Sequence, residues 1–566
     1  MAAPALALLL PQLLLLGDIH AQGSAQGERV YLFVDPLVVD ETEREDGGWT
    51  VEIAQPVKEA ANPLMREGTA ASGELWDTRW GNTYPTVRYD EHASLYRMWY
   101  NSFLHSSKPK ASGGTLYATS PDGLAWTKPM SSSITWNGTT QKTNLVLLAD
   151  ADPNRGVMFD THEQNASRRY KAFGSFWGNL CRQKGSGTPK SATHGTAWPP
   201  CRNLGVAYSA DGVHFDHGED ESAFQPGNQP DLDTVGQNDG ALDLAMWDPD
   251  LNGGSYWGLV RVDVDIQCLH NPACPDGFRR TGRFTTKDFK TFSPAKQAFH
   301  GRFNYEIYSI SPFRLPSWRA GYYMGTASFY NTTDEENEGY VVCELLQTVN
   351  WGANWSRVAR EGTEFIAHGP RDPPKRQTDS SGSRSFDSHT IYTAWSGDGS
   401  QLLDPKNASI SLFYYAGGNG PHSSKKYPRN DSIGLARSIT HGFAGLRAAP
   451  IEQQPQKEQK PVSQLETEVL HLVGGCNRLS LLASVELGGY IRVAATAPMT
   501  LEPKQYLAQT ITRSELRWTE LQWSLNPNEE KEEVTNGSIC SLVGLRSLTL
   551  RIEASGAVVY ALRVAP

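Results

Sequence analysis

The chain has 566 residues, of which 39% are hydrophobic, 10% aromatic and 20% charged, and its formal net charge at pH 7 is -10. This length exceeds what one hydrophobic core usually supports, so we expect at least two domains. The negative charge argues against a nucleic-acid partner, since such proteins usually carry a basic stripe. With 52 glycines and 34 prolines, the composition favours short strands and many turns over long helices.

Residues 4–16 form a largely apolar run near the N-terminus. The run is too short to cross a bilayer and has the length of a signal-peptide core. We therefore predict a signal peptide over residues 1–25, with cleavage after Ala21 or Ala25. No later stretch is apolar enough to span a membrane, so we expect a secreted, extracellular protein.

Sequons and cysteines agree with export. Seven Asn-x-Ser/Thr sequons predict a glycoprotein, at Asn137, Asn165, Asn331, Asn354, Asn407, Asn430 and Asn536. Seven cysteines suggest disulfides in an oxidising compartment, and six of them lie in pairs along the chain: Cys181 with Cys201, Cys268 with Cys274, and Cys476 with Cys540. Spacing alone does not fix the pairing. Cys343 would then be the odd cysteine, and the absence of a Cys-x-x-Cys set argues against zinc.

A two-part pattern recurs five times between residues 82 and 446. Each copy has a strand-like run with aromatic residues, followed by a second strand that ends in a Ser/Thr-x-Asp-like turn. The first copy combines residues 96–100 with residues 117–123. Long-period repetition of β-hairpin units is typical of a propeller with one blade per copy. We therefore predict a five-bladed β-propeller over residues 30–446.

The rest of the chain has a different composition. Residues 447–464 are rich in Gln, Pro, Lys and Glu, which predicts a linker. Residues 465–566 contain alternating runs such as 489–494 and 547–552, which indicate the short strands of a β-sandwich. The predicted fold is therefore all-β: a five-bladed β-propeller followed by a small C-terminal β-sandwich.

Polar residues just before the predicted innermost strands should meet at one mouth of the propeller, because these strands all line the central channel. Four of the five blades offer a carboxylate there, with aromatic or basic neighbours. The candidate catalytic residues are Asp77, Asp239, Asp243, Glu306 and Asp387. The candidate substrate-binding residues are Trp76, Arg79, Asn82, Arg261, Tyr305 and His389.

Carboxylates beside aromatic side chains fit sugar chemistry. Glycosidic cleavage uses one protonated carboxyl as acid and one ionised carboxylate as nucleophile or base. Plainer uses stay open: Asp77 could pair with Arg79, Asp239 and Asp387 could cap turns, and Arg79 or Arg261 could form ion pairs or bind an anionic substituent. Clustered carboxylates could also hold Ca²⁺ in the channel, and no other metal or cofactor is expected.

Asp122 and Asp211 stand in Ser-x-Asp-Gly turns. Although isolated aspartates of this kind look catalytic, Asp before Gly commonly caps the amides of a turn. We expect both to be structural.

Several segments resemble a known family. Residues 97–100 and 117–129 resemble the first blade of bacterial secreted proteins labelled as similar to glycosyl hydrolases of families 32 and 43. Residues 386–392 and 413–422 resemble their last blade, and residues 30–35 their start. The family's Asn-Asp-Pro-Asn-Gly motif is absent, and residues 151–155 match it only in part.

The resemblance covers nearly all of the mature chain, including the terminal sandwich. It implies a propeller of the invertase, fructanase and arabinanase kind. By that resemblance, Glu306 would be the general acid, and Asp77, Asp239, Asp243 or Asp387 would supply the nucleophile or base and the stabilising carboxylate.

The sequence thus predicts a secreted glycoside hydrolase that acts on an oligo- or polysaccharide. One alternative is a lectin-like propeller, which would have an aromatic mouth without a close carboxylate pair. Another is a sialidase-like enzyme, which would use three arginines around a carboxylate and usually a tyrosine nucleophile; the sequence alone identifies no such triad. Nothing in the sequence indicates an oligomeric state.

Overall fold

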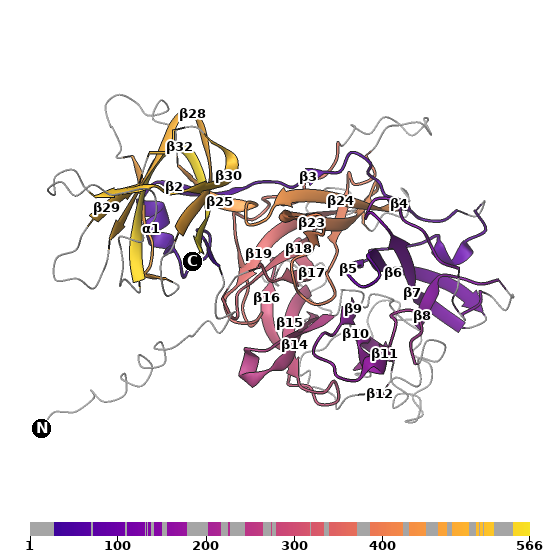
Figure 1. The fold of residues 1–566 in the computed structure, drawn as a ribbon. Helices are drawn as coiled ribbons and strands as arrows, with labels where there is room; N and C mark the ends of the chain where they lie inside the picture. Colours follow the sequence, from indigo (N-terminus) through magenta and orange to yellow (C-terminus); the bar gives the residue numbers. More distant parts are fainter. Residues whose placement is uncertain are drawn as a thin grey trace, which may run out of the picture.

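The computed structural model describes most of the chain from residue 28 onward (Figure 1). The described residues are 28–69, 72–107, 110–130, 132, 134–136, 141–149, 156–177, 202–216, 225–226, 244–263, 273, 279–316, 319–332, 339–370, 385–422, 429–448, 462–472, 478–496, 505–508, 510–512, 514–525 and 547–565. The predicted signal peptide, the sequons at Asn137 and Asn536, and every cysteine except Cys343 lie outside them. Cys343 is a buried free thiol, and burial raises its pKa to about 12.

Three four-stranded antiparallel sheets follow one another along the chain and make the first three units of the larger domain. In each unit the strands pair in chain order, which is the pattern of hairpins laid edge to edge. The first unit contains β5 (Thr86–Asp90), β6 (Leu95–Ser107), β7 (Lys110–Ser120) and β8 (Leu145–Ala149). The second contains β9 (Gly156–Phe159), β10 (Tyr170–Trp177), β11 (Arg202–Ser209) and β12 (Gln225–Pro226). The third contains β13 (Leu244–Asp248), β14 (Ser255–Asp263), β15 (Arg279–Thr286) and β16 (Lys296–His300).

The fourth and fifth units share one ten-stranded sheet, because β19 and β21 pair in parallel at Val341 and Thr390. The fourth unit contains β17 (Tyr305–Phe313), β18 (Tyr323–Asn331), β19 (Tyr340–Thr348) and β20 (Ser356–Arg357). The fifth contains β21 (Thr390–Thr393), β22 (Leu403–Asp404), β23 (Asn407–Gly418) and β24 (Asp431–Ile439), together with β3 (Val57–Lys58) and β4 (Met65–Arg66). The N-terminal part of the chain therefore supplies outer strands to the last unit, which closes the series.

The recurring Ser-x-Asp-Gly turns hold neighbouring units together. In the first turn the Asp122 carboxylate accepts the amides of Leu124 and Ala125, each at 2.8 Å, and these bonds lower its pKa. The carbonyl of Gly123 in this turn accepts the Tyr414 hydroxyl of the fifth unit at 2.9 Å. This set of contacts agrees with the structural role expected for Asp122.

The second turn repeats the arrangement one unit further on. Asp211 accepts the amides of Val213 and His214, and the Trp99 indole of the first unit donates to the Gly212 carbonyl at 2.7 Å. The turn thus has the same two tasks in both copies: its aspartate shapes the turn, and its glycine carbonyl receives an aromatic donor from the preceding unit.

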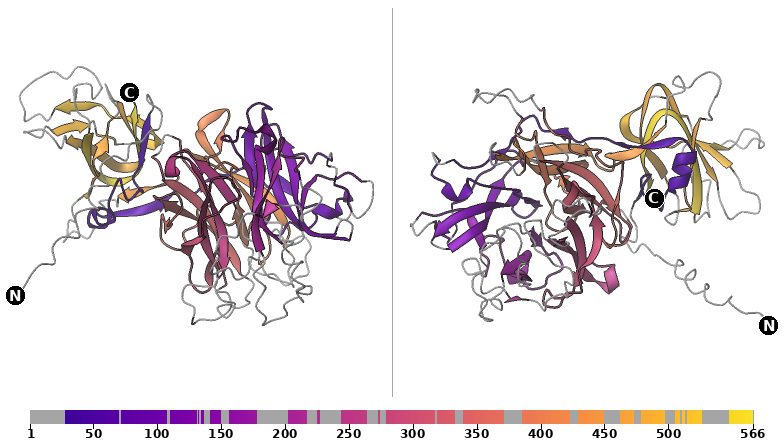
Figure 2. Two further views of the ribbon diagram at one scale, coloured as in Figure 1. Left: turned by 90° about the horizontal axis from the view of Figure 1, so that it is seen from below. Right: turned by 180° about the vertical axis from the view of Figure 1, so that it is seen from behind.

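The C-terminal domain is built on a second ten-stranded sheet, which lies to one side of the five units (Figures 1 and 2). Its strands are β1 (Arg29–Leu32), β2 (Trp49–Ile53), β25 (Ala444–Ala448), β26 (Ser463–Glu466), β27 (Leu470–His471), β28 (Arg478–Thr496), β29 (Gln505–Ala508), β30 (Ser514–Glu520), β31 (Trp523–Leu525) and β32 (Ser547–Ala565), and the six-residue helix α1 (Glu41–Asp46) lies beside them. The two longest strands, β28 and β32, pair with each other on both sides of a register shift between Val485 and Tyr490. β32 also pairs with β26 on one side of this shift and with β25 on the other.

The domain boundaries differ from the expectation that the propeller spans residues 30–446. β1 pairs with β32, and β2 pairs with β25, so the N-terminal segment belongs to the C-terminal sheet. Local sequence did not indicate this pairing because a short strand such as 29–32 carries no signal for a partner more than 500 residues away. Most of the predicted linker, residues 449–461, lies outside the described residues.

The predicted fold class is confirmed: the chain is an all-β propeller followed by a β-sandwich. In the part of the chain that the structure describes, no helix is long and apolar enough to cross a membrane. β5, β9, β13, β17 and β21 are the first strands of the five units in chain order, which is the position that lines the central channel of a propeller.

Candidate functional site

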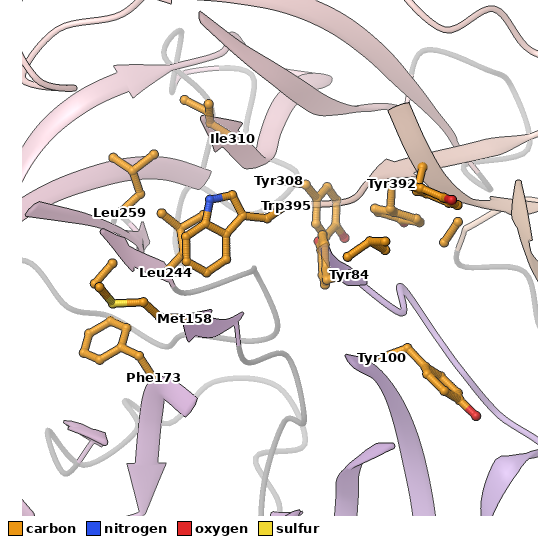
Figure 3. Close-up of a cluster of buried hydrophobic side chains, with 14 of the residues drawn as sticks. Tyr84, Tyr100, Met158, Phe173, Leu244, Leu259, Tyr308, Ile310, Tyr392 and Trp395 are labelled. Atoms are coloured by element: carbon orange, nitrogen blue, oxygen red, sulfur yellow. The ribbon is translucent and has the colours of Figure 1, made fainter. Parts of the chain in front are cut away.

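The segment 394–401 follows β21 and joins the fifth unit to three others through backbone hydrogen bonds. Backbone amides of three units donate to its carbonyls: Val87 to Trp395 at 2.8 Å, Phe159 to Gly397 at 2.8 Å, and Arg314 to Gly399 at 2.7 Å. The Trp395 ring is 1% exposed and lies among apolar side chains that include Leu244, Leu259 and Ile310 (Figure 3). This part of the channel is therefore filled by an apolar core.

Three tyrosines lie next to this apolar core and mark the change to a polar environment. Tyr84 contacts Tyr392 edge-on with ring centres 5.3 Å apart, and Tyr308 contacts Tyr392 at 6.1 Å (Figure 3). They come from the first, fourth and fifth units. The hydroxyls of Tyr308 and Tyr392 both meet one histidine, His422, which follows β23.

His422 is held between these two hydroxyls. Tyr392 Oη lies 2.6 Å from His422 Nδ1, and Tyr308 Oη lies 2.7 Å from His422 Nε2. Arg429 also approaches Nδ1, at 3.0 Å. Because a guanidinium can only donate, Nδ1 is the accepting nitrogen, and Nε2 carries the proton and donates to Tyr308.

His422 is a neutral imidazole in this setting. Its pKa lies well below the ordinary value of 6.5, first because the ring is buried and then because the charges of Arg429 and Arg261 oppose a further positive charge. Near neutral pH the ring therefore acts as a fixed hydrogen-bonding link between Tyr308 and Tyr392 rather than as a cation.

Three arginines surround this tyrosine and histidine pair. The guanidinium carbons of Arg261 and Arg279 lie 5.1 and 5.0 Å from the centre of the Tyr308 ring, and Arg429 contacts His422. Arg279 forms an ion pair of 2.7 Å with Glu306, at the leading end of β17. We call Arg261, Arg279, Glu306, Tyr308, Tyr392, His422 and Arg429 the channel cluster.

A pair of carboxyl groups stands behind Arg429. Asp431 contacts Arg429 at 3.0 Å, and the Glu67 carboxylate accepts the amide of Trp80 at 2.9 Å. Burial, and then repulsion by Asp431, raise the pKa of Glu67 to about 8; burial raises the pKa of Asp431 to about 6, although Arg429 opposes this shift. Near neutral pH, Glu67 is mostly protonated and Asp431 mostly ionised, so the pair carries about one negative charge.

Four predicted site residues lie in or beside the channel cluster. Glu306 and Arg261 belong to it. Asn82 lies next to it, with its side-chain nitrogen 3.3 Å from the Tyr84 hydroxyl and its oxygen 3.4 Å from Arg429. Tyr305 adjoins Glu306 in β17, stacks on Phe329 with ring centres 5.2 Å apart and donates to Glu344 at 2.5 Å.

His389 lies just before β21 and stacks on Tyr340, with ring centres 5.3 Å apart. Its Nδ1 lies 2.7 Å from the hydroxyl of Ser388. These contacts place His389 at the junction of the fourth and fifth units, where β19 pairs with β21.

Asp77 is fully buried inside the first unit, where it forms an ion pair with Lys128 and accepts the indole N–H of Trp80 at 2.5 Å. Burial raises its pKa to about 6 against the opposing effect of Lys128. Its neighbour Trp76 is also buried and donates to Asn144 at 2.9 Å. The sequence suggested Arg79 as the ion-pair partner of Asp77, whereas the cation that contacts its carboxylate is Lys128.

The other predicted residues have equally local surroundings. Asp387 is 1% exposed, contacts Lys58 at 2.5 Å and accepts the Tyr415 hydroxyl at 2.8 Å. The guanidinium carbon of Arg79 lies 5.6 Å from the centre of the Phe103 ring. Asp239 and Asp243 lie outside the described residues. Among the residues that the structure does describe, no group of three or more His, Cys, Asp and Glu side chains is arranged to hold a metal ion.

Sequence reasoning did not select any of these cluster residues as site residues: Arg279, Tyr308, Tyr392, His422 and Arg429. A signal existed for Tyr308, because it follows Glu306 by two residues in one strand, and alternate residues share a face. For Arg279 and Arg429, which reach the cluster from separate units, no comparable local signal exists.

Comparisons with known proteins add little to this picture. No family model matches the chain, and no curated protein matches it. Solved structures with some similarity include an N-acetylgalactosamine deacetylase from F. plautii, 14% identical with a TM-score of 0.39, for which the match covers 69% of this chain and 95% of that chain. A GH32 β-fructofuranosidase of Bombyx mori is 9% identical with a TM-score of 0.36, covering 89% and 94%. An exo-β-1,3-galactanase from Phanerochaete chrysosporium is 11% identical with a TM-score of 0.32, covering 90% and 100%.

At TM-scores below 0.5, these similarities do not indicate which reaction or ligand belongs to this chain. A function has to be argued from the channel cluster itself.

Proposed function

We propose that the chain is a secreted glycoside hydrolase whose site is the channel cluster. The observation that supports this most is the position of Glu306: a carboxylate at the leading end of an innermost strand, beside Tyr308 and in contact with Arg279. Carboxyl groups that flank the scissile bond carry out glycosidic cleavage, and an aromatic ring beside them offers a flat apolar surface on which a sugar ring packs.

The ion pair with Arg279 suggests which of the two carboxylate tasks Glu306 performs. A general acid has to hold a proton when the substrate binds, whereas an ion pair with arginine forms with the ionised carboxylate. We therefore assign Glu306 the task of the ionised carboxylate, as nucleophile, base or stabiliser of the oxocarbenium-like transition state. This differs from the general-acid role implied by the family resemblance. Asp239 and Asp243 then remain the predicted candidates for the proton donor.

Hydrolysis of a panel of polysaccharides and aryl glycosides by the purified protein tests the proposal. We expect Glu306→Gln to reduce turnover by at least a hundredfold. The matched control is Glu361→Gln in the same unit, since Glu361 also pairs with arginine, Arg302 at 2.7 Å, but is partly exposed. Equal turnover in wild type and Glu306→Gln would remove Glu306 from the mechanism. Glycan binding without turnover in the wild type would support the lectin-like alternative.

A further inference from the structure

The fifth unit meets the channel cluster at one of its two ends. β23 ends at Gly418, which pairs with Asp431, the first residue of β24. His422 follows β23, and Arg429 stands two residues before Asp431. Both of these cluster residues therefore lie at this end of the unit, which we call the entrance end. Asn430 lies here too, directly after Arg429, and it is the asparagine of an Asn-x-Ser sequon.

The fourth unit presents Glu306 at the same end. β19 and β21 pair in parallel at Val341 and Thr390, close to the start of both strands. The start of β17 lies at this end as well, because β17, β18 and β19 pair antiparallel in turn. At the other end, β21 leads towards Trp395, which is 1% exposed in the apolar core. We therefore expect a ligand to reach the channel cluster from the entrance end.

Asn430 is an exposed position between two largely buried side chains. The side chains of Arg429 and Asp431 are 11% and 3% exposed and form an ion pair at 3.0 Å, whereas Asn430 is exposed. The backbone N–H of Asn430 donates to the side-chain oxygen of Asn419 at 3.0 Å, which fixes the backbone at this point. Asn331, a second sequon at the entrance end, is half-buried. A group attached to Asn430 can thus extend into solvent without disturbing the ion pair, although its Cα is only about 3.8 Å from that of Arg429.

We propose that Asn430 carries an N-linked oligosaccharide that partly covers the entrance to the channel cluster and limits the size of the substrate that reaches it. An N-glycan is bulky and lies on the surface, so at this position it hinders a polysaccharide more than a short glycoside. The inference rests on the proposed function and on the predicted export of the chain. It specifies the substrate class as short glycans and chain ends.

The modification is a group transfer that takes place during export. The donor is an oligosaccharide linked through pyrophosphate to a polyprenyl lipid. The amide nitrogen of Asn430 bonds to the anomeric carbon and loses a proton to solvent, while the bond from the anomeric carbon to the pyrophosphate oxygen breaks and the lipid pyrophosphate leaves with the electron pair. Because the chain is modified before it folds, the 1% exposure of Ser432 in the folded protein does not prevent the transfer.

A matched sequon lies at the opposite end of the same unit. Asn407 is exposed and is the first residue of β23. β23 has 12 residues, and at about 3.3 Å per residue its two ends are roughly 35 Å apart. A glycan on Asn407 is therefore far from the entrance end, and its removal controls for general effects of glycan loss on folding and solubility.

Glycopeptide mass spectrometry of the full chain secreted by cultured insect cells tests the modification itself. We expect most molecules to carry a glycan on Asn430. An unmodified Asn430 in the secreted chain would overturn the inference, whatever the protein cleaves.

Substrate size provides the second measurement. For each sugar of the hydrolysis panel, kcat/KM is measured with the polysaccharide and with the aryl glycoside, and the ratio of the two values is compared between variants. Asn430→Gln should raise this ratio at least threefold and change kcat/KM for the aryl glycoside less than twofold, because the small substrate passes beside the glycan. Ser432→Ala removes the sequon but keeps Asn430 and should have the same effect, whereas Asn407→Gln should leave the ratio unchanged. Thermal unfolding of each variant verifies that it is folded.

The outcomes separate this inference from the proposed function. A glycan on Asn430 together with the same ratio in wild type, Asn430→Gln and Ser432→Ala would overturn the inference, and turnover that depends on Glu306 would then leave the proposed function standing. If the wild type cleaves none of the panel, the proposed hydrolase fails, and the ratio is formed from the dissociation constants of the same compounds. A ratio that shifts only when the Asn430 glycan is lost would uphold the inference, while an unchanged ratio or no binding at all would overturn it.

Discussion

Tyr308 and His422 are separated by 114 residues, yet Tyr308 Oη lies 2.7 Å from His422 Nε2. Tyr308 is part of β17 in the fourth unit, and His422 follows β23 in the fifth, so this hydrogen bond joins two units at the channel. Nδ1 of the same histidine accepts hydrogen bonds from the Tyr392 hydroxyl and from Arg429. The bond therefore links the strands of the propeller to the arginines of the channel cluster.

Tyr308→Phe should destabilise the protein by about 1–3 kcal/mol, because His422 Nε2–H loses its acceptor in a buried site. Tyr308 is 5% exposed. The same variant should lose most of its affinity for carbohydrate, since the ring would no longer be tied to His422. Chemical denaturation and glycan titration measure the two effects.

The control for this variant is Tyr490→Phe in the sandwich. Tyr490 is partly exposed and its hydroxyl bonds to Glu553 at 3.0 Å, so its removal should cost less than 1 kcal/mol. If Tyr308→Phe were as stable as Tyr490→Phe and bound glycans as the wild type does, the bond to His422 would have no role in the site.

His441 should make stability depend on acid pH. It lies between β24 and β25, donates to the Pro316 carbonyl at 3.3 Å and contacts Trp518 of the sandwich. Burial lowers its pKa to about 4 from an ordinary value of 6.5. Between these two pH values His441 is protonated in the unfolded chain but neutral in the folded chain. The free energy of unfolding therefore decreases as the pH falls from about 6.5 to about 4, by about 3 kcal/mol in total.

His441→Gln keeps a donor for Pro316 but cannot be protonated. Its unfolding free energy should therefore fall less steeply than that of the wild type between pH 6.5 and 4, as measured by urea denaturation at several pH values. His214→Gln is the control, because His214 is exposed and pairs with Asp211 at the surface. Parallel pH profiles for wild type and His441→Gln would show that folding does not lower the pKa of His441.

The sequence was informative where a feature depends on a few neighbouring residues. The turns at Asp122 and Asp211 could be recognised because aspartate, glycine and the accepted amides are all within five residues. The propeller could be recognised because its units repeat these turns. The sandwich could be recognised because its long strands alternate buried and more exposed residues, as Arg551 and Ile552 do.

The candidate site depends on contacts between units, and there local patterns were a poorer guide. Asp77 resembles a mouth carboxylate in the sequence, but its partner Lys128 lies 51 residues further on and holds it inside the first unit. Arg429 carries no signal of its own, because its role follows from where β23 and β24 bring it, next to His422. Glu306 was found because the leading end of an innermost strand is a topological position that the repeats define.

Glu67 should make the protein less stable as the pH rises, which is opposite in sign to the effect of His441. Its pKa is raised to about 8 from an ordinary 4.5, so the folded chain holds a proton that the unfolded chain has lost. Stability therefore falls as the pH rises from about 4.5 through about 8. Between pH 6.5 and 8, where protonation of His441 in the unfolded chain fades, this loss should be visible as a falling melting temperature.

Glu67→Gln removes the ionisable group and leaves a neutral side chain beside Asp431. Its melting temperature should fall less than that of the wild type between pH 6.5 and 8, as measured by calorimetry. Glu59→Gln should leave the wild-type slope unchanged, because Glu59 pairs with Arg437 on the surface of the fifth unit. A slope that survives in Glu67→Gln would locate the responsible group elsewhere.

Gly212→Ala tests the contact between the first and second units. Gly212 has a φ of +78°, and a Cβ there would lie 2.7 Å from Cζ2 of Trp99, whose indole donates to the Gly212 carbonyl. The variant should lose about 1–2 kcal/mol through backbone strain and a further amount through displacement of the Trp99 ring.

Gly73→Ala isolates the first of these two costs. Gly73 has a similar φ of +76°, but nothing lies within 4 Å of the position its Cβ would take. The difference in unfolding free energy between Gly212→Ala and Gly73→Ala therefore reports the contacts of the new Cβ with the rings of Trp99 and Tyr170. We expect Gly212→Ala to be the less stable variant by at least 1 kcal/mol, and the gap to narrow when Trp99 is replaced by leucine in both. Equal destabilisation by the two glycine variants would mean that the Trp99 ring yields without cost, and that the turn is not what holds these two units together.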